Sequence, residues 1–289
     1  AFEEAEKNNK LPKAVVVVNL YGQSADMDPI LELCQKYNVP LLEDAAESLG
    51  ATYKGRMSGT IGDIGIYSFN GNKIITTSGG GMMVSNNEEY TKKATFWATQ
   101  SREAERHYEH KEIGYNYRMS NVIAGVVRGQ YKYLDEHIAQ KKAIYERYKE
   151  GLKDLPVKMN PYIEDIMEPN FWLSCLLINK EAMCKQVRND SGVLYISEPG
   201  KSCPTEILEA IASINAEGRP IWKPMHMQPI YRMNPFITVN GDGRAKTNAY
   251  IESDFLDISM DIFSRGVCLP SDNKMTAEQQ DIIIEIIKE

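Results

Sequence analysis

The stretch AVVVV at residues 14–18 is a continuous β-branched run, a pattern typical of a parallel strand covered on both faces. Asp28-Pro29 then indicates a helix start, because proline is favoured at the first helical position. Apolar residues recur at helical spacing up to Tyr37, and the next short strand, VPLL at 39–42, ends at Glu43-Asp44. Strand, helix and strand form a βαβ unit, which predicts an α/β fold built on a parallel sheet.

Further elements are predicted downstream of this unit. Residues 62–69, 73–77 and 81–85 have strand patterns, and residues 88–97 have a helical pattern. Residues 101–117 are polar and aromatic with little periodicity, which predicts a long functional loop.

A long helical pattern marks the boundary between two predicted domains. It runs from Ser120 to about Leu155, long enough to predict a break near residues 134–137, and Pro156 and Pro161 end it. We therefore expect a large domain over residues 1–155 and a smaller α+β domain over 156–289. The smaller domain would contain strands at 172–178 and 193–196, a helix near Thr205 and a final amphipathic helix from Thr276.

Composition narrows the class of protein. A formal net charge of −7 over 289 residues argues against a nucleic-acid surface. The sequence has no apolar run of membrane-spanning length and no visible signal peptide, so no membrane span is predicted. The five cysteines form no CxxC pair, which predicts reduced thiols in a cytoplasmic protein and no metal site.

Asp44, Ser68 and Lys73 follow one another in this order, and together they supply the residue types that pyridoxal 5′-phosphate (PLP) chemistry requires. Such a site needs a lysine to hold the aldehyde, a carboxylate to keep the pyridine nitrogen protonated, and donors for the phosphate. Taken alone, the spacing leaves a simpler interpretation open: most lysines are solvent-exposed, and an aspartate after a strand is often a helix cap.

Several longer motifs support the cofactor interpretation. The segments LEDAAESLGA, YSFNGNK, TTSGGG, GYNYRMS, RPIWKPMH and GVCLPS resemble, in order, the DegT/DnrJ/EryC1/StrS aminotransferases; they lie at residues 42–51, 67–73, 76–81, 114–120, 219–226 and 266–271. These are PLP enzymes that act on nucleotide-linked keto sugars. The resemblance implies the aspartate-aminotransferase-like fold, with a three-layer α/β/α large domain and a smaller α+β C-terminal domain.

The resemblance also implies a role for each residue of the cofactor site. Lys73 would form the Schiff base, Asp44 would pair with the pyridine nitrogen, and Glu47 would approach the phenolic oxygen. Ser68 would bind the phosphate. Asn116 would reach the phosphate of the neighbouring subunit's cofactor, so a homodimer with shared active sites is expected.

The implied reaction moves an amino group from L-glutamate to a UDP-linked 4-keto-6-deoxy-N-acetylhexosamine. Residues 98–102 and 107–110 most resemble enzymes of bacillosamine-type pathways, which would place the protein in bacterial surface-glycan synthesis. Arg219 and Lys223 would meet a diphosphate and His226 the sugar. A loop simply packed on the domain surface is an equally open interpretation of these three residues.

Two other functions remain as alternatives. PLP-dependent sugar dehydratases of the same family carry histidine at the Schiff-base position, so Lys73 argues against that activity. The other alternative is a non-catalytic module that keeps the fold without the cofactor.

The start of the chain bears on this second alternative. Members of the family carry roughly a hundred further residues before the equivalent of Ala14, a domain-sized stretch, including a helix N-terminus that binds the phosphate. We therefore expect an incomplete large domain, weak PLP binding and poor dimerisation. Asn19 stands where many members have histidine, and we assign it no chemical role; Tyr21 and Gln23 are predicted to be structural or peripheral.

Overall fold

The computed structural model describes residues 1–189, 192–231, 233–238, 241–242 and 257–289. The chain forms two compact units. The N-terminal unit comprises residues 2–142 and 162–172, and the C-terminal unit comprises residue 1 with residues 143–161 and 173–289. The units interleave along the chain, and the predicted domain boundary after Leu155 stays a prediction.

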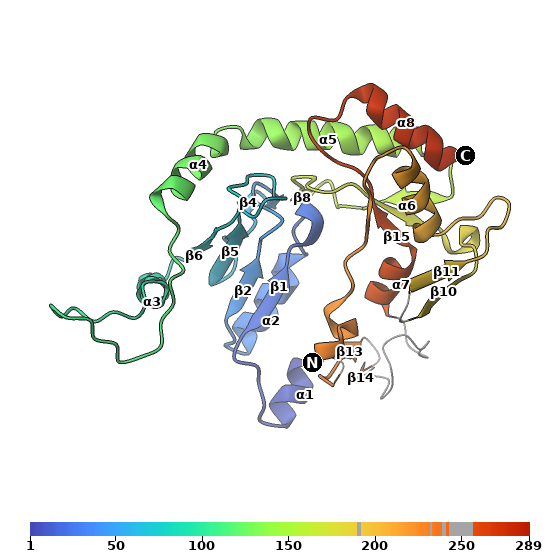
Figure 1. Cartoon of the computed structure of the whole chain (residues 1–289). Coiled ribbons are helices and arrows are strands. Elements are labelled where there is room, and N and C mark those ends of the chain that lie inside the picture. Colours follow the sequence, from blue (N-terminus) through green and yellow to red (C-terminus); the bar gives the residue numbers. More distant parts are fainter. Residues whose placement is uncertain (190–191, 232, 239–240, 243–256) are drawn as a thin grey trace. The chain divides into compact units, whose positions relative to one another are not determined.

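A four-stranded sheet of order β1-β2-β5-β6 organises the N-terminal unit (Figure 1). Strands β1 (Val15–Val18), β2 (Leu41–Asp44) and β5 (Ile64–Ser68) are parallel, and β6 (Gly81–Val84) is antiparallel to β5. Helix α2 (Met27–Lys36) connects β1 to β2, so the predicted βαβ unit is confirmed. A short helix, α1 (Phe2–Lys7), precedes it.

The two faces of this sheet differ in burial. Met27 and Cys34 of α2 pack with Leu41 and Val17 in one apolar cluster. The side chains on the other face of β1 are exposed: Val16 has 60% and Val18 49% of its surface accessible. The prediction that β1 is covered on both faces is therefore wrong for the described residues, because α2 covers only one of them.

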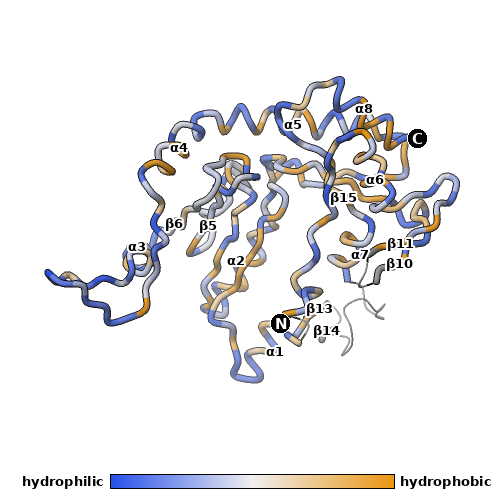
Figure 2. Tube along the Cα trace, in the orientation of Figure 1, coloured by the Kyte–Doolittle hydropathy of each residue, from blue (hydrophilic) through white to orange (hydrophobic). Residues whose placement is uncertain are grey.

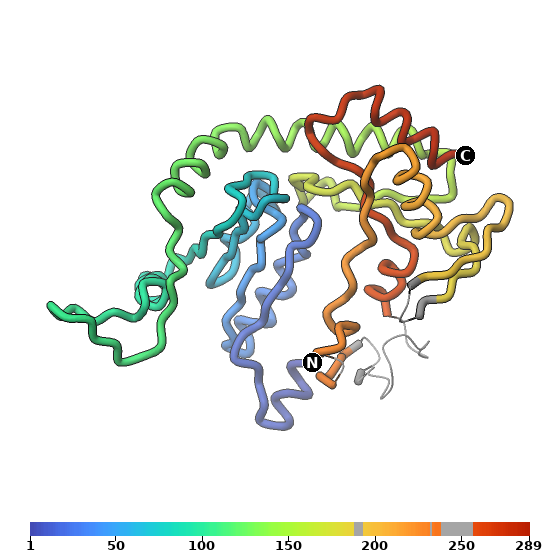
Figure 3. The backbone as a smooth tube through the Cα atoms, viewed as in Figure 1, coloured from blue at the N-terminus to red at the C-terminus, as the bar shows by residue number. Residues whose placement is uncertain are grey.

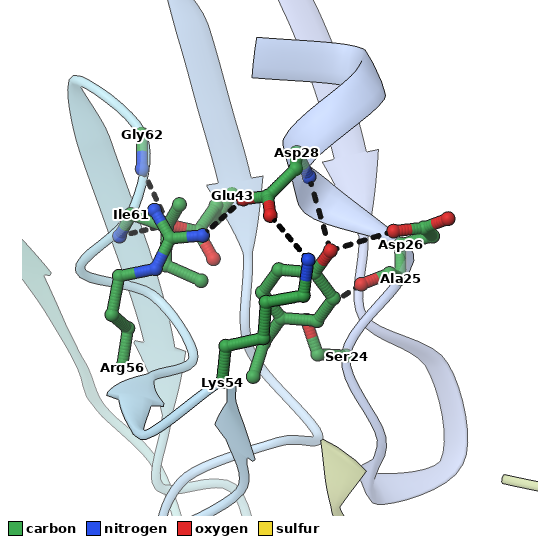
Figure 4. Close-up of polar contacts among 10 residues, drawn as sticks. Ser24, Ala25, Asp26, Asp28, Glu43, Lys54, Arg56, Ile61 and Gly62 are labelled. Atoms are coloured by element: carbon green, nitrogen blue, oxygen red, sulfur yellow. Dashed lines mark hydrogen bonds and ion pairs between the residues drawn. The ribbon is translucent and has the colours of Figure 1, made fainter. Parts of the chain in front are cut away.

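A small hairpin is bound to the start of α2 by ion pairs. Strands β3 (Thr52–Tyr53) and β4 (Arg56–Met57) form the hairpin, and β8 (Met167–Glu168) pairs with β3. Both Lys54 and Arg56 form ion pairs with Asp28 in the first turn of α2, as Figure 4 shows. Hydrogen bonding from Lys54 is the main cause that lowers the pKa of the Asp28 carboxyl. These contacts fix the hairpin to the helix that supports the sheet.

The segment after β5 is a loop, so the predicted strand over residues 73–77 is wrong. Lys73 N donates to Asn70 O over 3.0 Å, and Thr77 N donates to Phe69 O over 2.8 Å, which closes two turns. Ile74 and Ile75 are both buried. Adjacent side chains of a strand point to opposite faces, so burial of both is not expected for a strand with one exposed face.

Two helices, the first half of a third and a long loop complete the N-terminal unit, since residues from 143 onward belong to the C-terminal unit. Helix α3 (Glu88–Ala98) is confirmed, and residues 99–120 then extend from the sheet as a loop, which Figure 3 traces between α3 and α4. The long helical pattern divides into α4 (Asn121–Tyr131) and α5 (Leu134–Gly151). The predicted break is confirmed but lies at residues 132–133, slightly before its expected place.

The C-terminal unit is built on an antiparallel sheet of order β12-β15-β9-β7. Helices α6 (Pro204–Ser213) and α8 (Ala277–Lys288) pack their apolar residues into its core, and Figure 2 shows the hydrophobic positions recurring along α8. Both helices start where the sequence predicted. None of the helices in the described ranges has both the length and the apolarity needed to cross a bilayer.

The remaining elements of this unit have the following bounds: β7 Val157–Met159, β9 Cys175–Ile178, β10 Gln186–Asn189, β11 Gly192–Tyr195, β12 Arg219–Pro220, β13 Ile237–Thr238, β14 Gly241–Asp242, α7 Ile258–Arg265 and β15 Gly266–Cys268. Single turns of 3-10 helix are η1 Leu20–Gly22 in the N-terminal unit, and η2 Lys180–Ala182, η3 Met225–Met227 and η4 Pro229–Tyr231 in the C-terminal unit.

Candidate cofactor site around Lys73

Asp44 and Ser68 lie at the carboxyl ends of two neighbouring parallel strands. Asp44 of β2 pairs in register with Ile66 of β5, and Ser68 follows two residues later, so both side chains leave the same face of the sheet. Asp44 Oδ1 accepts a hydrogen bond from Ala46 N over 3.1 Å, and Ser68 Oγ accepts one from Asn70 N over 3.3 Å. Strand ends of this kind are where open α/β sheets bind ligands.

The Lys73 side chain points inward from the loop after β5. Its Nζ lies 3.6 Å from Glu47 Oε1 and 4.3 Å from the centre of the Trp172 ring. The side chains of Lys73 and Glu47 are each only 13% exposed. Lys73 is thus not a solvated surface lysine, so the simpler interpretation fails for this residue. It stays open for Asp44, whose Oδ1 accepts from Ala46 N as a local cap would.

Glu47 is itself held in place by the segment after β1. Its Oε2 accepts a hydrogen bond from the backbone N–H of Tyr21 over 2.8 Å. Tyr21 has a φ of 57°, a left-handed conformation that is uncommon for a tyrosine. Tyr21 therefore has a structural role of the kind predicted: its backbone N–H holds the side chain of Glu47.

Two residues of this neighbourhood were missed in the sequence. Trp172 faces Lys73 and donates its Nε1–H to Asn72 O over 2.7 Å. The fully buried Asn170 donates to the carbonyl oxygens of Glu47 and Leu49, both over 2.9 Å. No local pattern signals either residue, because both reach the site from a segment about a hundred positions away in the sequence.

A second carboxylate supports the end of β2 from the opposite face. Glu43 is fully buried and accepts from Gly59 N at 2.8 Å, Ile61 N at 2.5 Å, Gly62 N at 2.6 Å and Asn19 Nδ2 at 3.2 Å. Figure 4 shows the backbone nitrogens of Ile61 and Gly62 directed at it. These donors satisfy a charge that would otherwise be costly to bury.

The neighbours of this carboxylate are also structural. Asn19 is fully buried, donates to Ser58 Oγ over 2.8 Å and accepts from Ala25 N over 3.0 Å. Its side chain therefore lies in the interior rather than beside Lys73. Tyr67 donates its hydroxyl to Ser58 O, and burial, with the negative charge of Glu43, raises the pKa of Tyr67 to about 12.

Asn116 lies apart from the other predicted site residues within one chain. It is exposed in the loop between α3 and α4, where it forms an isolated bridge with Thr99. It lines a shallow, open cavity with Gln100 and His110. No contact of the described residues joins it to Lys73, and its expected role at a neighbouring subunit's cofactor stays a prediction.

Arg219, Lys223 and His226 belong to the C-terminal unit. Arg219 is exposed and forms an ion pair with Glu217, and Lys223 is half-buried. His226 Nε2 lies 2.6 Å from Asp257 Oδ2, and the His226 ring stacks on Phe236 with centres 4.0 Å apart. The His226 imidazole is thus oriented by the Asp257 carboxylate. The substrate-binding roles of Arg219, Lys223 and His226 stay predictions.

The groups around Lys73 match the needs of PLP. A half-buried amine, a carboxylate and a hydroxyl stand at one sheet edge, with the carboxylate and hydroxyl on one face. This donor set would hold an aldehyde carbon, a protonated ring nitrogen and a phosphate, respectively. In the described ranges, no three His, Cys, Asp or Glu side chains are grouped to hold a metal ion.

The sequence profile of the DegT/DnrJ/EryC1/StrS aminotransferase family matches residues 3–288, nearly the whole chain. The chain belongs to this family. The family membership predicted from the six motifs is therefore confirmed.

Several named proteins share substantial sequence identity with the chain. EpsN of Bacillus subtilis, named as a PLP-dependent aminotransferase, is 45% identical over 99% of the chain and 66% of its own length. GDP-perosamine synthase of Escherichia coli O157:H7 is 31% identical over 98% of the chain and 67% of its own length. UDP-4-amino-4,6-dideoxy-N-acetyl-beta-L-altrosamine transaminase of Campylobacter jejuni is 34% identical over 62% of the chain and 48% of its length. The chain thus spans about two thirds or less of these relatives.

Solved structures of aminotransferases share the fold, among them a DegT/DnrJ/EryC1/StrS aminotransferase and a sugar aminotransferase. One from Brucella abortus superposes with a TM-score of 0.77 at 22% identity, covering all of this chain and 67% of its own. The PLP form of Spr1654 from Streptococcus pneumoniae has a TM-score of 0.75 at 19% identity, covering 98% of this chain and 70% of its own. The predicted fold class is confirmed by these structures, and PLP is the cofactor of this family.

Proposed function

We propose that this protein is a PLP-dependent sugar-nucleotide aminotransferase in which Lys73 holds the cofactor. One observation carries the proposal: the Lys73 ammonium is half-buried beside Glu47, at the sheet edge where Asp44 and Ser68 share a face. A lysine withdrawn from solvent next to a carboxylate is a common feature of functional sites. Family membership supplies the reaction class.

Each residue would have a definite task in this reaction. When bound, PLP would supply an electron-accepting ring. Asp44 would keep a proton on the ring nitrogen, and Ser68 would donate to the phosphate. Lys73 would hold the cofactor covalently and, once displaced by the amine donor, would carry the proton that moves at the substrate carbon.

The proposed substrates are L-glutamate and a UDP-linked 4-keto-6-deoxy-N-acetylhexosamine. The motif resemblance to bacillosamine-type enzymes favours this sugar, and the transaminase from Campylobacter jejuni has a UDP-amino sugar in its name. Arg219 and Lys223 would meet the diphosphate, and His226, oriented by Asp257, would contact the sugar. A GDP-linked keto sugar is the competing substrate, since GDP-perosamine synthases are also relatives.

We also propose a homodimer with shared active sites, working in the cytoplasm. Helix α4 buries none of its residues in the single chain, although Val122 and Val126 are apolar and exposed. A second copy would cover this face and bring Asn116 to the partner's cofactor. The five cysteines are buried as reduced thiols, consistent with a reducing compartment.

Reductive trapping tests the cofactor role of Lys73 even when PLP binds weakly. The protein would be incubated with excess PLP, reduced with borohydride and digested, and the phosphopyridoxyl group located by mass spectrometry. We expect the label on Lys73 well above the other lysines, and its loss in Lys73→Arg. A label spread evenly over surface lysines would contradict the proposal and favour a module without cofactor.

A substrate panel tests the reaction. With PLP in excess, UDP-, GDP- and dTDP-linked 4-keto sugars would be assayed with glutamate, and amino-sugar formation followed by mass. We expect turnover of the UDP-linked N-acetylated sugar and none with Lys73→Ala. Exclusive turnover of a GDP-linked sugar would keep the reaction class but replace the substrate.

A further inference from the structure

The Lys73 ammonium lies between a carboxylate and an indole ring. Glu47 Oε1 is 3.6 Å from Nζ, and the Trp172 ring centre is 4.3 Å from it. A cation at this distance from an indole is attracted by the negative charge density of the ring face. Both contacts favour the free, charged amine of Lys73 at one defined position.

Trp172 is tied to the backbone just before Lys73. Its Nε1–H donates to Asn72 O over 2.7 Å, which orients the ring. A buried indole N–H generally has a partner, and here that partner belongs to the residue adjacent to Lys73. The same side chain therefore holds the Lys73 loop and faces the Lys73 amine.

Asn170 connects both neighbours of Lys73. Its side-chain N–H groups donate to Glu47 O and Leu49 O, each over 2.9 Å, and its Oδ1 accepts from Trp172 N over 2.9 Å. Its backbone N–H donates to Gly22 O over 2.8 Å. A fully buried amide with these contacts fixes three chain segments relative to one another.

The backbone beside these contacts is in an uncommon conformation. Phe171, between Asn170 and Trp172, has a φ of 54°, and Tyr21, which donates to Glu47, has a φ of 57°. Left-handed residues of this kind each cost about 1–2 kcal/mol. Such outliers gather where surrounding structure fixes a functional geometry.

From these contacts we infer that Asn170 is a positioning residue, and that Glu47 and Trp172 form a holding site for the released amine of Lys73. The inference rests on the proposed role of Lys73. In that reaction the lysine leaves its covalent link when the donor amine arrives, and it must stay nearby to carry a proton. A fixed carboxylate and ring would keep it there.

Nuclear magnetic resonance of the cofactor-free chain tests the holding site directly. With ¹³C-labelled lysine, the Lys73 methylene next to Nζ is assigned by comparison with Lys73→Arg. We expect its proton signal upfield of the other lysine signals, because the Trp172 ring shields it. Trp172→Phe would keep most of this shift, and Trp172→Leu would abolish it.

Asn170→Asp is the decisive variant for the positioning role. It keeps the shape and the acceptor for Trp172 N but places oxygen against Glu47 O and Leu49 O, so the Lys73 signal should move towards that of exposed lysines. Tyr53→Phe is the matched control, since it removes a hydrogen bond to Asp26 on the α2 side of the sheet. It should lower stability and leave the Lys73 signal unchanged.

The outcomes separate this inference from the proposed function. An unmoved Lys73 signal in folded Asn170→Asp would overturn the positioning role of Asn170, and an unmoved signal in Trp172→Leu would overturn the holding site. If Asn170→Asp does not fold, Trp172→Leu still decides the holding site, and Asn170→Ser, which removes the side-chain amide without adding a charge, decides the positioning role. If PLP is trapped on Lys73 but the Lys73 signal does not change in the Asn170 and Trp172 variants, the proposed function stands and this inference is wrong.

Discussion

Glu43 and Asp44 are neighbours in sequence, yet their carboxylates leave β2 on opposite faces. Glu43 is fully buried among backbone N–H groups, while Asp44 is half-buried on the face that carries Ser68. Glu43 thus stabilises the end of the strand from the buried face, and Asp44 lies on the face of the proposed cofactor site. The two residues should respond differently to loss of charge.

Replacing Glu43 by glutamine should destabilise the protein strongly. An amide in place of the carboxylate would direct an N–H group at the backbone donors of Gly59, Ile61 or Gly62. An unsatisfied buried donor of this kind costs about 2–4 kcal/mol. Urea unfolding followed by circular dichroism measures the loss. Asp44→Asn is the control and should change stability by less than about 1 kcal/mol; equal losses for the two variants would contradict this account.

Gly22→Ala should be much worse than an alanine at another left-handed glycine. Gly22 has a φ of 94°, and a Cβ there would lie 2.0 Å from Asn170 Oδ1 and 2.8 Å from Trp172 N. Gly55 has a φ of 72° but nothing within 4 Å of an added Cβ, so Gly55→Ala isolates the backbone strain. We expect unfolding free energies lower by about 1 kcal/mol for Gly55→Ala and roughly 2–4 kcal/mol for Gly22→Ala. Similar losses of unfolding free energy in the two variants would show that the segment around Asn170 can shift to accommodate the added methyl group.

The phenol of Tyr67 should make stability fall at alkaline pH. Its pKa in the folded protein is about 12, raised by burial and by the charge of Glu43, against about 10 in an unfolded chain. A raised pKa means that the stabilisation is fully present below pH 10 and is lost as pH rises towards 12. Tyr67→Phe should be less stable by about 1–2 kcal/mol at pH 8, having lost the bond to Ser58 O. The difference should shrink between pH 10 and 12; a constant difference would argue against the shift.

The cysteines should react slowly in the native protein. All five are buried, burial raises the pKa of Cys34, and burial with hydrogen bonding to Cys203 raises that of Cys184 to about 11. Because the thiolate is the reactive form, native protein at pH 8 should react with DTNB far more slowly than protein in urea. Ala212→Cys, at an exposed position of α6, should add one fast thiol. Rapid reaction of any of the five native cysteines in the folded protein would contradict this account.

The sequence predicts the fold and the centre of the site because both depend on local signals. The β-branched run at residues 14–18 and the proline at 29 define the βαβ unit, and that unit places Asp44 at a strand end. The same β-branched signal is misleading at Ile74-Ile75, where both side chains are buried in a loop. Propensity cannot separate a strand from a buried turn of two residues, since tertiary packing decides.

The remainder of the site depends on long-range contacts that no local pattern shows. Trp172 and Asn170 reach the Lys73 neighbourhood from a segment that reads as the start of a strand, and β9 begins only at Cys175. Tyr21 contributes through a left-handed backbone conformation that a tyrosine does not signal. Residues of this kind emerge only when distant segments are brought together.

The proposed shared site predicts complementation between two inactive variants. In a mixed dimer of Lys73→Ala and Asn116→Ala chains, one site would combine Lys73 of one protomer with Asn116 of the other and would be intact. With random mixing, half of the dimers are hybrids with one intact site of two, so about a quarter of the wild-type rate should return, measured with excess PLP. Mixing Lys73→Ala with Asp44→Asn should restore nothing, because both residues belong to the same N-terminal unit and every site would lack one of them. No recovery in the first mixture would show that Asn116 serves its own chain or no site at all.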